Sequence, residues 1–353
     1  MIREGIQKLI EGANLTHEES RDVMKEVISG KATNAQIAAL LTALRMKGET
    51  VEELISFAEI MREHCCQIHP HVNGRLLDTC GTGGDKIKTF NISTAAAFAV
   101  AGAGVAVAKH GNRSVTSQSG SADVLEKLGL NLNMKPDVVQ NTIEQVGIGF
   151  MFAPAFHPAM KYATSPRKEI GIRTVFNVLG PLTNPACANA QLLGVYDPKL
   201  TAPLAQALNK LGCEEAMVVH GLDGLDEIST VGKTIISWLK EGEILTVETA
   251  PENFGVEKAS IEAIKGTTPE ESAEILFKIL NGCSATDDSR RDIVLVNSAA
   301  GIIVGGKAED FGYGMEVARE SIDSGAAYKK LKALIKASNG NLAKLEELES
   351  KYA

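Results

Sequence analysis

A short apolar run that ends in glycines and leads into a helix is the feature that most restricts how this chain can fold. Leu76 to Thr79 predicts a buried strand, Cys80 to Asp85 reads CGTGGD, and Asn91 to Thr94 opens an alanine-rich helix. A strand, a glycine loop and a helix start in this order form an anion site. The glycines let backbone N–H groups approach the anion, and the helix end adds positive partial charge. The segment therefore predicts a phosphate-binding loop in an α/β domain.

Two other interpretations of this loop have to be weighed. A glycine turn with an ordinary helix cap is the plain alternative for any glycine run. A dinucleotide-binding loop would require glycine where the chain has Lys86, and a suitably placed acidic residue after a second strand, which is absent. The hydroxyls of Ser93 and Thr94 can donate to a phosphate or ligate a metal, and this favours the phosphate interpretation.

The rest of the chain indicates an all-helical start followed by alternating β-rich and helical runs. Apolar residues recur at helical spacing over the first 64 residues, and Thr16 with Glu19 and Thr50 with Glu53 predict two capping boxes. The chain is almost wholly helical from residue 268 onward. This order predicts an α/β fold in which a small all-helical domain accompanies a large, doubly wound, mostly parallel sheet flanked by helices. Further strands are predicted at Val105–Ala108, Gly149–Phe152, Gln191–Val195 and Ala216–His220, with an edge hairpin of Ile235–Leu239 and Ile244–Val247.

A second polar loop follows the strand that ends at Ala108. Lys109 and Arg113 supply positive charge there, and three hydroxyls follow before the next helix, on Ser117, Ser119 and Ser121. Because the carboxyl ends of parallel strands meet at one edge of a sheet, this loop is the natural place for a second phosphate. The alternative is that these residues only solvate a turn.

Two adjacent carboxylates, Asp226 and Glu227, follow the strand that ends at His220. Mg²⁺ usually takes one or two protein carboxylates and fills its other positions with water and phosphate oxygens. A solvated acidic turn is the common alternative. Combined with two phosphate loops, the pair predicts a magnesium site.

Composition and two misleading motifs narrow the classes of function. The formal net charge of −8 argues against nucleic acid or an anionic membrane as a partner, and six cysteines without a CxxC pair fit a reducing cytoplasm. No apolar stretch reaches the ~20 residues of a membrane helix, and no signal pattern opens the chain. The histidines and cysteines of residues 64–71 lack a second ligand pair for zinc. Gly301 to Lys307 resembles a Walker loop but precedes Ala308, so it predicts a helix stop.

Several separated blocks then occur in order along the chain, and together they resemble the anthranilate phosphoribosyltransferase family. The resemblance covers nearly the whole chain. The blocks are GTGGD at 81–85, TFNIST at 89–94, AKHGNRSV at 108–115, SGSADVLEKLG at 119–129, RKEIGIRT at 167–174, FNVLGPLTNP at 176–185 and HGLDGLDEIS at 220–229.

The resemblance implies a fold, an assembly and a reaction. The small helical domain would comprise residues 1–70 plus about 160–186, and the large α/β domain residues 71–159 plus 187–353. The small domains would join two copies into a homodimer. The enzyme would transfer the phosphoribosyl group of phosphoribosyl pyrophosphate to anthranilate with Mg²⁺, as a step of tryptophan biosynthesis.

The resemblance also implies site residues. Lys109, Asn112 and Arg167 would act by electrostatics and positioning, without a covalent nucleophile. Asp226, Glu227 and the hydroxyl of Ser93 would hold Mg²⁺. The anthranilate path would be lined by Gly81, His110, Asn112, His157 and Arg167, with Arg167 clamping the carboxylate. Phosphoribosyl pyrophosphate would be held by Gly81, Gly84, Asp85, Thr89, Asn91, Ile92, Ser93, Thr94, Lys109, Gly111, Asn112, Arg113, Ser114, Ser117 and Ser121.

Two positions depart from the family pattern, and two rival functions remain open. Lys86 stands where similar proteins often have glycine, and Phe156 precedes His157 where the family often has two histidines.

A pyrimidine nucleoside phosphorylase shares this architecture but has no need of the acidic pair. A non-catalytic nucleic-acid-binding relative would require a basic face, which the net charge disfavours.

Overall fold

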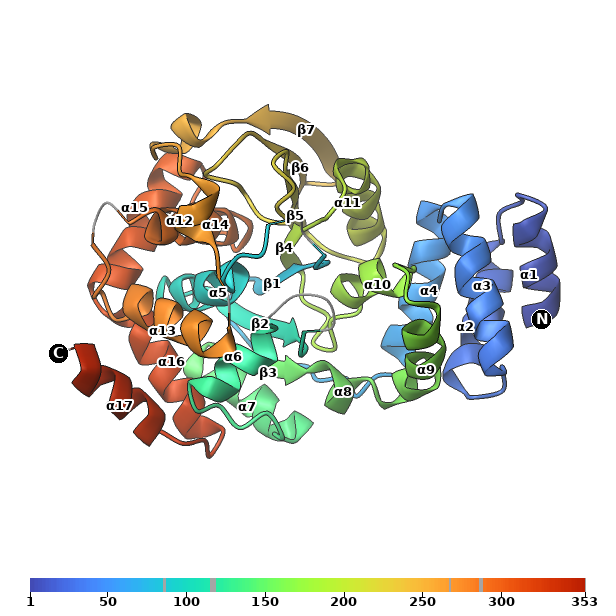
Figure 1. Cartoon of the computed structure of the whole chain (residues 1–353), viewed down its shortest axis with the longest axis horizontal. Coiled ribbons are helices and arrows are strands. Elements are labelled where there is room, and N and C mark those ends of the chain that lie inside the picture. The colour runs from blue at the N-terminus through green and yellow to red at the C-terminus, as the bar shows by residue number, and fades with distance from the viewer. Residues whose placement is uncertain (85–86, 115–118, 267, 286–287, 353) are drawn as a thin grey trace.

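The computed structural model describes residues 1–84, 87–114, 119–266, 268–285 and 288–352. A small N-terminal helical domain lies beside a larger α/β domain built on one central sheet (Figure 1). This confirms the predicted fold class. None of the helices in the described ranges combines the length and apolar character needed to cross a membrane.

The N-terminal domain consists of four helices whose starts are set by their capping residues. The capping boxes predicted at Thr16 and Thr50 are confirmed, and a third begins at Thr33, where Gln36 bonds back to the cap. Each box satisfies N–H groups that have no partner within the helix, so the helix begins at one residue. The four helices are α1 (Ile2–Ile10), α2 (His17–Ile28), α3 (Asn34–Lys47) and α4 (Val51–Glu63).

The sheet has seven strands in the order β3-β2-β1-β4-β5-β6-β7. The first five strands in chain order pair in parallel, and β6 and β7 form the predicted antiparallel hairpin at one edge. The strands are β1 (Leu76–Gly81), β2 (Ala106–Gly111), β3 (Ile148–Phe152), β4 (Ala190–Gly194), β5 (Glu215–Gly221), β6 (Thr234–Lys240) and β7 (Glu243–Thr249).

The order of strands creates a switch point between β1 and β4. From β1 the chain adds β2 and β3 on one side, then returns to add β4 and β5 on the other. Crossovers therefore leave β1 and β4 in opposite directions, and a crevice opens outside their carboxyl ends. The two phosphate-type loops and the acidic loop follow β1, β2 and β5, so all three reach this edge.

Strands β1 and β2 continue further into the polar motifs than the sequence predicted. The predicted strands end at Thr79 and Ala108, whereas the observed strands end at Gly81 and Gly111. The extra residues pair with β4 and β3, so backbone hydrogen bonds extend the strands despite their polar side chains. As a result, Lys109 projects from a strand instead of a loop.

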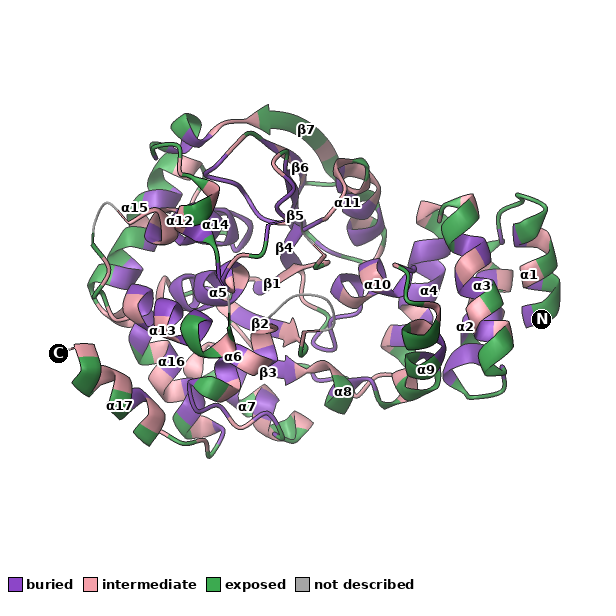
Figure 2. Ribbon diagram, in the orientation of Figure 1, coloured by how far each residue is buried: buried purple, intermediate pink, exposed green. Residues whose placement is uncertain are grey.

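Alternating residues of the central strands face two hydrophobic clusters. Leu192 and Met217 belong to the cluster formed with helices α5 and α14, whereas Leu193 and Val218 belong to the cluster shared with α11 and the N-terminal helices. Period-two alternation places successive side chains on opposite faces. The central strands are buried, whereas β7 at the edge is largely exposed (Figure 2).

The remaining helices cover the sheet or link the two domains. Helix α9 packs against α2 and α3, and α10 packs against α4. The GxxxxGK motif lies at the end of α14, which confirms the predicted helix stop. These helices are α5 (Ile92–Gly102), α6 (Ser121–Lys127), α7 (Pro136–Val146), α8 (Ala153–Phe156), α9 (Lys161–Ile170), α10 (Phe176–Leu182), α11 (Thr201–Lys210), α12 (Ile261–Ile264), α13 (Pro269–Leu280), α14 (Ser289–Val304), α15 (Phe311–Asp323), α16 (Ala326–Ala337) and α17 (Ala343–Tyr352).

Candidate active site

A cavity of about 340 Å³ lies at the carboxyl ends of β1 and β2, closed on the other side by α9 and α10. Gly84 and His157 are not among its lining residues, and Asp85 and Ser117 lie outside the described residues. Most of the site residues implied by the resemblance meet here, although they come from six separate segments. Those that line the cavity are Gly81, Thr89, Asn91, Ile92, Ser93, Thr94, Lys109, His110, Gly111, Asn112, Arg113, Ser114, Ser121, Arg167, Asp226 and Glu227.

The glycine loop after β1 packs directly against the acidic loop after β5. The N–H of Gly83 donates to Oδ2 of Asp226 over 2.8 Å, and the N–H of Thr82 donates to the carbonyl of Gly194 over 2.9 Å. A Cβ at Gly81 would displace the same carboxylate, so the absence of a side chain there permits this close approach. The amide of Gly83 thus already points at an anionic oxygen.

The start of α5 brings a hydroxyl, a cation and a carboxylate together. The N–H of Ser93 donates to Oε1 of Glu227 over 3.2 Å, and the ammonium of Lys109 lies 3.5 Å from the hydroxyl oxygen of Ser93. Lys109 also donates to the carbonyl of Thr79 over 2.5 Å. Lys109 is only 3% exposed, and this burial lowers its pKa. The cavity therefore has a positive charge with little surrounding water at its floor.

Asp226 and Glu227 fit the requirements of a divalent cation. Burial raises the pKa of Asp226, which means that its charge lacks full compensation from the protein. In the parts of the chain that the structure describes, no group of three His, Cys, Asp or Glu side chains gathers as a metal site. Two carboxylates beside a serine hydroxyl nevertheless suit Mg²⁺, which completes its shell with water and phosphate oxygens.

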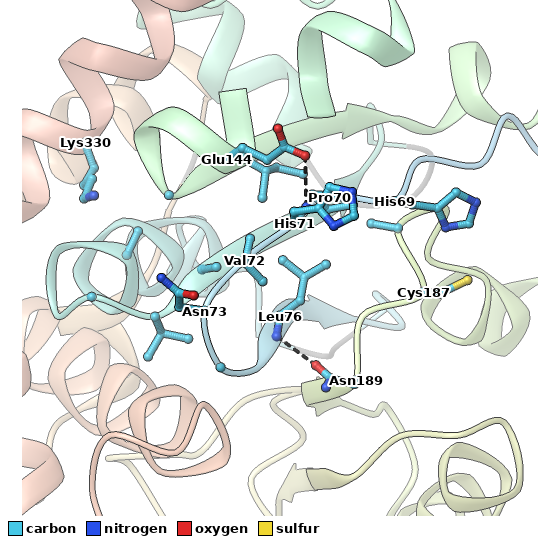
Figure 3. A pocket seen from close by; sticks show the side chains of 18 residues that line it. His69, Pro70, His71, Val72, Asn73, Leu76, Glu144, Cys187, Asn189 and Lys330 are labelled. Carbon is cyan, nitrogen blue, oxygen red and sulfur yellow. Dashed lines mark hydrogen bonds between the residues drawn. The ribbon is translucent and has the colours of Figure 1, made fainter. Parts of the chain in front are cut away.

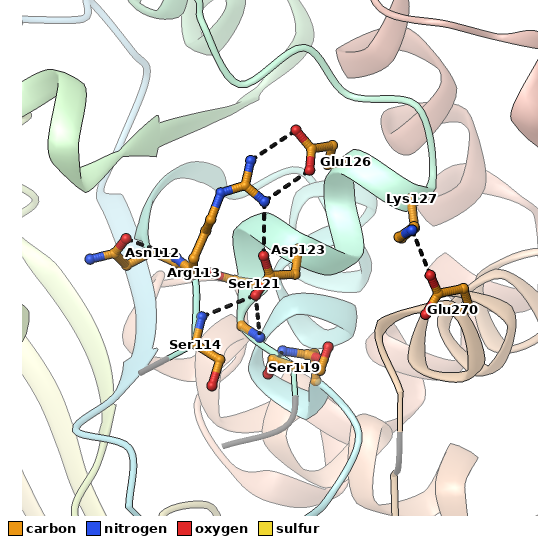
Figure 4. Close-up of polar contacts among 11 residues, drawn as sticks. Asn112, Arg113, Ser114, Ser119, Ser121, Asp123, Glu126, Lys127 and Glu270 are labelled. Carbon is orange, nitrogen blue, oxygen red and sulfur yellow. Dashed lines mark hydrogen bonds and ion pairs between the residues drawn. The ribbon is translucent and has the colours of Figure 1, made fainter. Parts of the chain in front are cut away.

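In the second loop, Arg113 forms ion pairs with two acidic residues of α6. Its guanidinium lies 2.9 Å from Asp123 and 2.8 Å from Glu126 of α6, and these ion pairs raise its pKa (Figure 4). Oδ2 of Asp123 also accepts the N–H groups of Ser114 and Gly120, each over 3.0 Å. In this arrangement Arg113 holds the loop to α6 while it still lines the cavity, and its contact with a phosphate stays a prediction.

The far wall of the cavity carries Arg167 and His110. The guanidinium of Arg167 lies over the ring of Phe176 at 5.2 Å, and burial lowers its pKa. Among the described residues it forms no ion pair with a carboxylate. Burial lowers the pKa of His110 to about 3, and its buried Nε2 has no hydrogen-bond partner in the described structure. A guanidinium without a counter-ion and a neutral imidazole can together receive a small aromatic acid.

Behind this wall lie His157, which the family resemblance implies for the anthranilate path, and Asp78, which the sequence motifs did not single out. The ring of His157 lies 5.1 Å from that of His110 at a tilt of 45°, and its Nε2 bonds the carbonyl of Thr183. Oδ1 of Asp78 accepts the N–H of His110 over 3.2 Å, and burial raises the pKa of Asp78 to about 6. A carboxylate inside the apolar run of β1 is the signal that could have identified Asp78. His157 contacts the lining residue and not the cavity itself.

A larger hollow of about 750 Å³ lies near the opposite ends of the strands, between the linker before β1, α7 and α16 (Figure 3). Its carboxylate at Glu144 accepts the N–H of His71 over 2.9 Å, and Lys330 donates to the carbonyl of Val146 over 2.6 Å. These groups stabilise the local backbone. The charged side chains that converge on one point, Lys109, Asp226 and Glu227, lie instead in the cavity of about 340 Å³.

The doubly wound sheet, the two anion loops and the adjacent carboxylates define an enzyme that transfers a sugar phosphate. The glycosyl transferase family's helical bundle domain matches residues 3–65, and the same family's a/b domain matches residues 73–328.

More similar proteins identify the branch of this class. Anthranilate phosphoribosyltransferases of Petrotoga mobilis and Methanocorpusculum labreanum are 50% and 52% identical to the chain, covering 95% and 96% of it and 96% and 99% of their own lengths. The crystal structure of the enzyme from Thermus thermophilus has a TM-score of 0.88 at 40% identity, covering 95% of this chain and 99% of that one. The Saccharomyces cerevisiae enzyme in complex with PRPP and Mg also has a TM-score of 0.88, at 29% identity over 96% of this chain and 98% of that one. The chain belongs to the anthranilate phosphoribosyltransferase family.

Proposed function

We propose that this protein transfers the phosphoribosyl group of phosphoribosyl pyrophosphate to the amine of anthranilate. The products are N-(5-phosphoribosyl)anthranilate and pyrophosphate, and the reaction belongs to tryptophan biosynthesis. The observation that carries the proposal is the meeting of the Gly83 amide, Lys109 and the Asp226–Glu227 pair in one cavity that Arg167 closes.

The donor subsite is assigned to the sheet side of the cavity. We assign the diphosphate to the amides of the glycine loop, the start of α5 and the ammonium of Lys109. Asp226, Glu227 and the hydroxyl of Ser93 would hold Mg²⁺, which when bound neutralises charge on the diphosphate. In the structure Gly83 donates to Asp226, so the same amide could donate to a diphosphate oxygen, and the carboxylate of Asp226 would then be available to hold the cation.

The acceptor subsite is assigned to the side of α9 and α10. The planar guanidinium of Arg167 matches the two oxygens of the anthranilate carboxylate. The neutral ring of His110 and the amide of Asn112 can orient the aromatic ring and its amine. His157 remains a prediction for this subsite, and its contact with His110 supports a role in holding that ring.

The reaction needs positioning and charge stabilisation more than proton transfer. The bond between C1 and pyrophosphate breaks, and its electron pair leaves with pyrophosphate. The amine nitrogen bonds C1 with its lone pair and loses one proton to solvent. Because the anthranilate amine is already neutral near pH 7, correct orientation supplies much of the rate. Amides and Lys109 facing the leaving group stabilise its developing charge, and each such donor is worth ~3 kcal/mol.

The assembly is also a proposal. Packing of α9 against α2 and α3 supports a helical domain that joins residues 1–70 with about 160–186. Exposed apolar side chains on this domain, Ile10 at 63% and Met46 at 84%, support a homodimer formed through it. A cytoplasmic location fits the six free cysteines and the biosynthetic reaction.

Loss of anthranilate fluorescence on mixing with phosphoribosyl pyrophosphate and Mg²⁺ tests the proposal. Turnover should require both the donor and the metal. Phosphorolysis of thymidine with inorganic phosphate, and no fluorescence loss, would instead indicate a nucleoside phosphorylase.

Asp226→Asn combined with Glu227→Gln tests the metal site in the same assay. This variant should lose Mg²⁺-dependent turnover because two neutral amides replace the carboxylates. Undiminished turnover would remove this pair from the mechanism.

A further inference from the structure

Arg173 connects the donor and acceptor sides of the cavity without lining it. It lies between α9 and α10, two residues after Gly171, which ends α9 in the left-handed conformation at φ 63°. Its Nη2 donates to the carbonyl of Gly84 in the glycine loop. Its guanidinium also lies over the ring of Tyr196, 4.4 Å from the centroid.

The guanidinium of Arg173 lies directly against Gly84 of the glycine loop. Gly84 has φ 79°, and a Cβ there would collide with the guanidinium of Arg173. The backbone of Gly84 and the guanidinium of Arg173 are therefore in direct contact. A charge-assisted hydrogen bond and a cation–π contact both act on the same guanidinium, and both weaken if α9 moves away from the loop.

The same loop is anchored to the sheet from its other side. The N–H of Tyr196 donates to the hydroxyl of Thr82 over 3.1 Å, and the N–H of Thr82 donates to Gly194. Arg173 thus joins a loop held by β4 to a segment that also carries Arg167. The two arginines are six positions apart in the sequence, so a shift of this segment affects both.

We propose that Arg173 is a positioning residue that couples the two subsites, so that a diphosphate bound at the glycine loop strengthens binding of the aromatic acid at Arg167. The inference rests on the proposed function and adds a coupling to it. A diphosphate that binds the amides of the described part of the loop holds the carbonyl of Gly84 in place, and Gly84 in turn holds Arg173 and the segment before it. Coupling between two sites is reciprocal, so the aromatic acid strengthens diphosphate binding by the same factor.

The test measures anthranilate affinity by its fluorescence, with and without saturating pyrophosphate and Mg²⁺. Pyrophosphate carries no ribose, so no transfer occurs during the measurement. In the unaltered protein pyrophosphate should tighten anthranilate binding at least about fivefold, the lower end of typical coupling. Arg173→Met should reduce that ratio to less than about twofold while the affinity without pyrophosphate changes by less than about twofold.

Two further variants separate coupling from folding. Tyr196→Phe retains the ring under the guanidinium and should keep the full ratio. Arg173→Lys retains the charge but loses the planar contact, and should give an intermediate ratio even if the methionine variant does not fold.

The coupling would be overturned if a folded Arg173→Met variant, or Arg173→Lys, kept the full tightening of anthranilate binding by pyrophosphate. It would also be overturned if Arg173→Met weakened anthranilate binding equally with and without pyrophosphate. Absence of a ratio in the unaltered protein would also overturn it. If that protein fails to transfer phosphoribose, the proposed function itself is wrong. If it transfers normally while the ratio survives in the variants, only the coupling is wrong.

Discussion

Gly194→Ala places a methyl group where the acidic loop crosses the end of β4. Gly194 pairs with Gly81 of β1 in the parallel register, and the backbone of Asp226 passes directly over it. A Cβ at position 194 would overlap the carbonyl carbon and oxygen of Asp226, which are backbone atoms. Unlike a flexible side chain, this backbone cannot rotate away, so the loop must move as a unit.

The required movement sets the expected effect. Real Cβ atoms essentially never lie closer than 3.0 Å to a neighbouring atom, so the loop must withdraw by more than about 1 Å. A misplacement of ~1 Å can cost ~100-fold in rate, which corresponds to ~2.7 kcal/mol of transition-state stabilisation. Because the displaced residues are the proposed cation ligands, the Mg²⁺ concentration for half-maximal rate should rise as well. Overpacking of this kind typically costs ~1–3 kcal/mol of stability, so the protein should remain folded.

The anthranilate fluorescence assay, run over a series of Mg²⁺ concentrations, measures both effects. Gly312→Ala is the matched control, because this glycine lies in α15, away from the cavity, and its Cβ would meet only the side chain of Asp310 at 3.2 Å. Far-ultraviolet circular dichroism checks the fold of both variants. A folded Gly194→Ala enzyme with the unaltered rate and Mg²⁺ dependence would refute the reasoning about the acidic loop.

Two further predictions concern the acceptor wall. Arg167→Ala should raise the KM for anthranilate about 10- to 100-fold, since a charged hydrogen bond is worth ~1.5–3 kcal/mol, and should leave the KM for the sugar donor within about threefold. Equal changes in both constants would contradict the assignment. Burial lowers the pKa of His110 to about 3 and that of His157 to about 4, below the unfolded value of ~6.5, so the unfolded chain takes up protons first as the pH falls. The free energy of unfolding should stay constant above pH ~6.5. Below that pH it should decrease by up to ~1.4 kcal/mol per pH unit for each imidazole. Asp78 offsets part of this loss, because its pKa is raised to about 6 and the native state therefore takes up its proton first. Urea denaturation between pH 7.5 and 4.5 measures this slope, which His157→Asn should reduce, and an unchanged slope would count against the buried imidazole.

Local patterns were sufficient for the fold class and for the location of the site. The capping threonines at 16 and 50 predicted helix starts because a cap bonds residues three positions away. The glycine loop, the loop after Ala108 and the acidic pair predicted one shared edge, because parallel strands bring their carboxyl ends together. The observed strand order and the cavity lining agree with that geometry.

The pairing of charges could not be predicted in the same way. Arg113 and Lys109 lie in one polar segment, yet Arg113 pairs with α6 and Lys109 is buried beneath the cavity. Which cation pairs with an acidic side chain depends on where α6 packs, and that is decided by contacts distant in the sequence. The observed ends of β1 and β2 were not predicted for a related reason. Backbone hydrogen bonds to β4 and β3 extend these two strands into segments whose polar side chains indicated loops.

The amino-acid sequence by itself determined the family, the order of strands and helices, and the segments that supply the site, because these depend on periodicity and on residues close together in the chain. Only the tertiary structure decided that Gly83 bonds Asp226, that His157 lies behind His110, and that Arg173 reaches Gly84. Each of these contacts joins residues far apart in the sequence. Whether such a contact forms depends on small differences in packing and desolvation, and these appear only when the two segments are folded against each other.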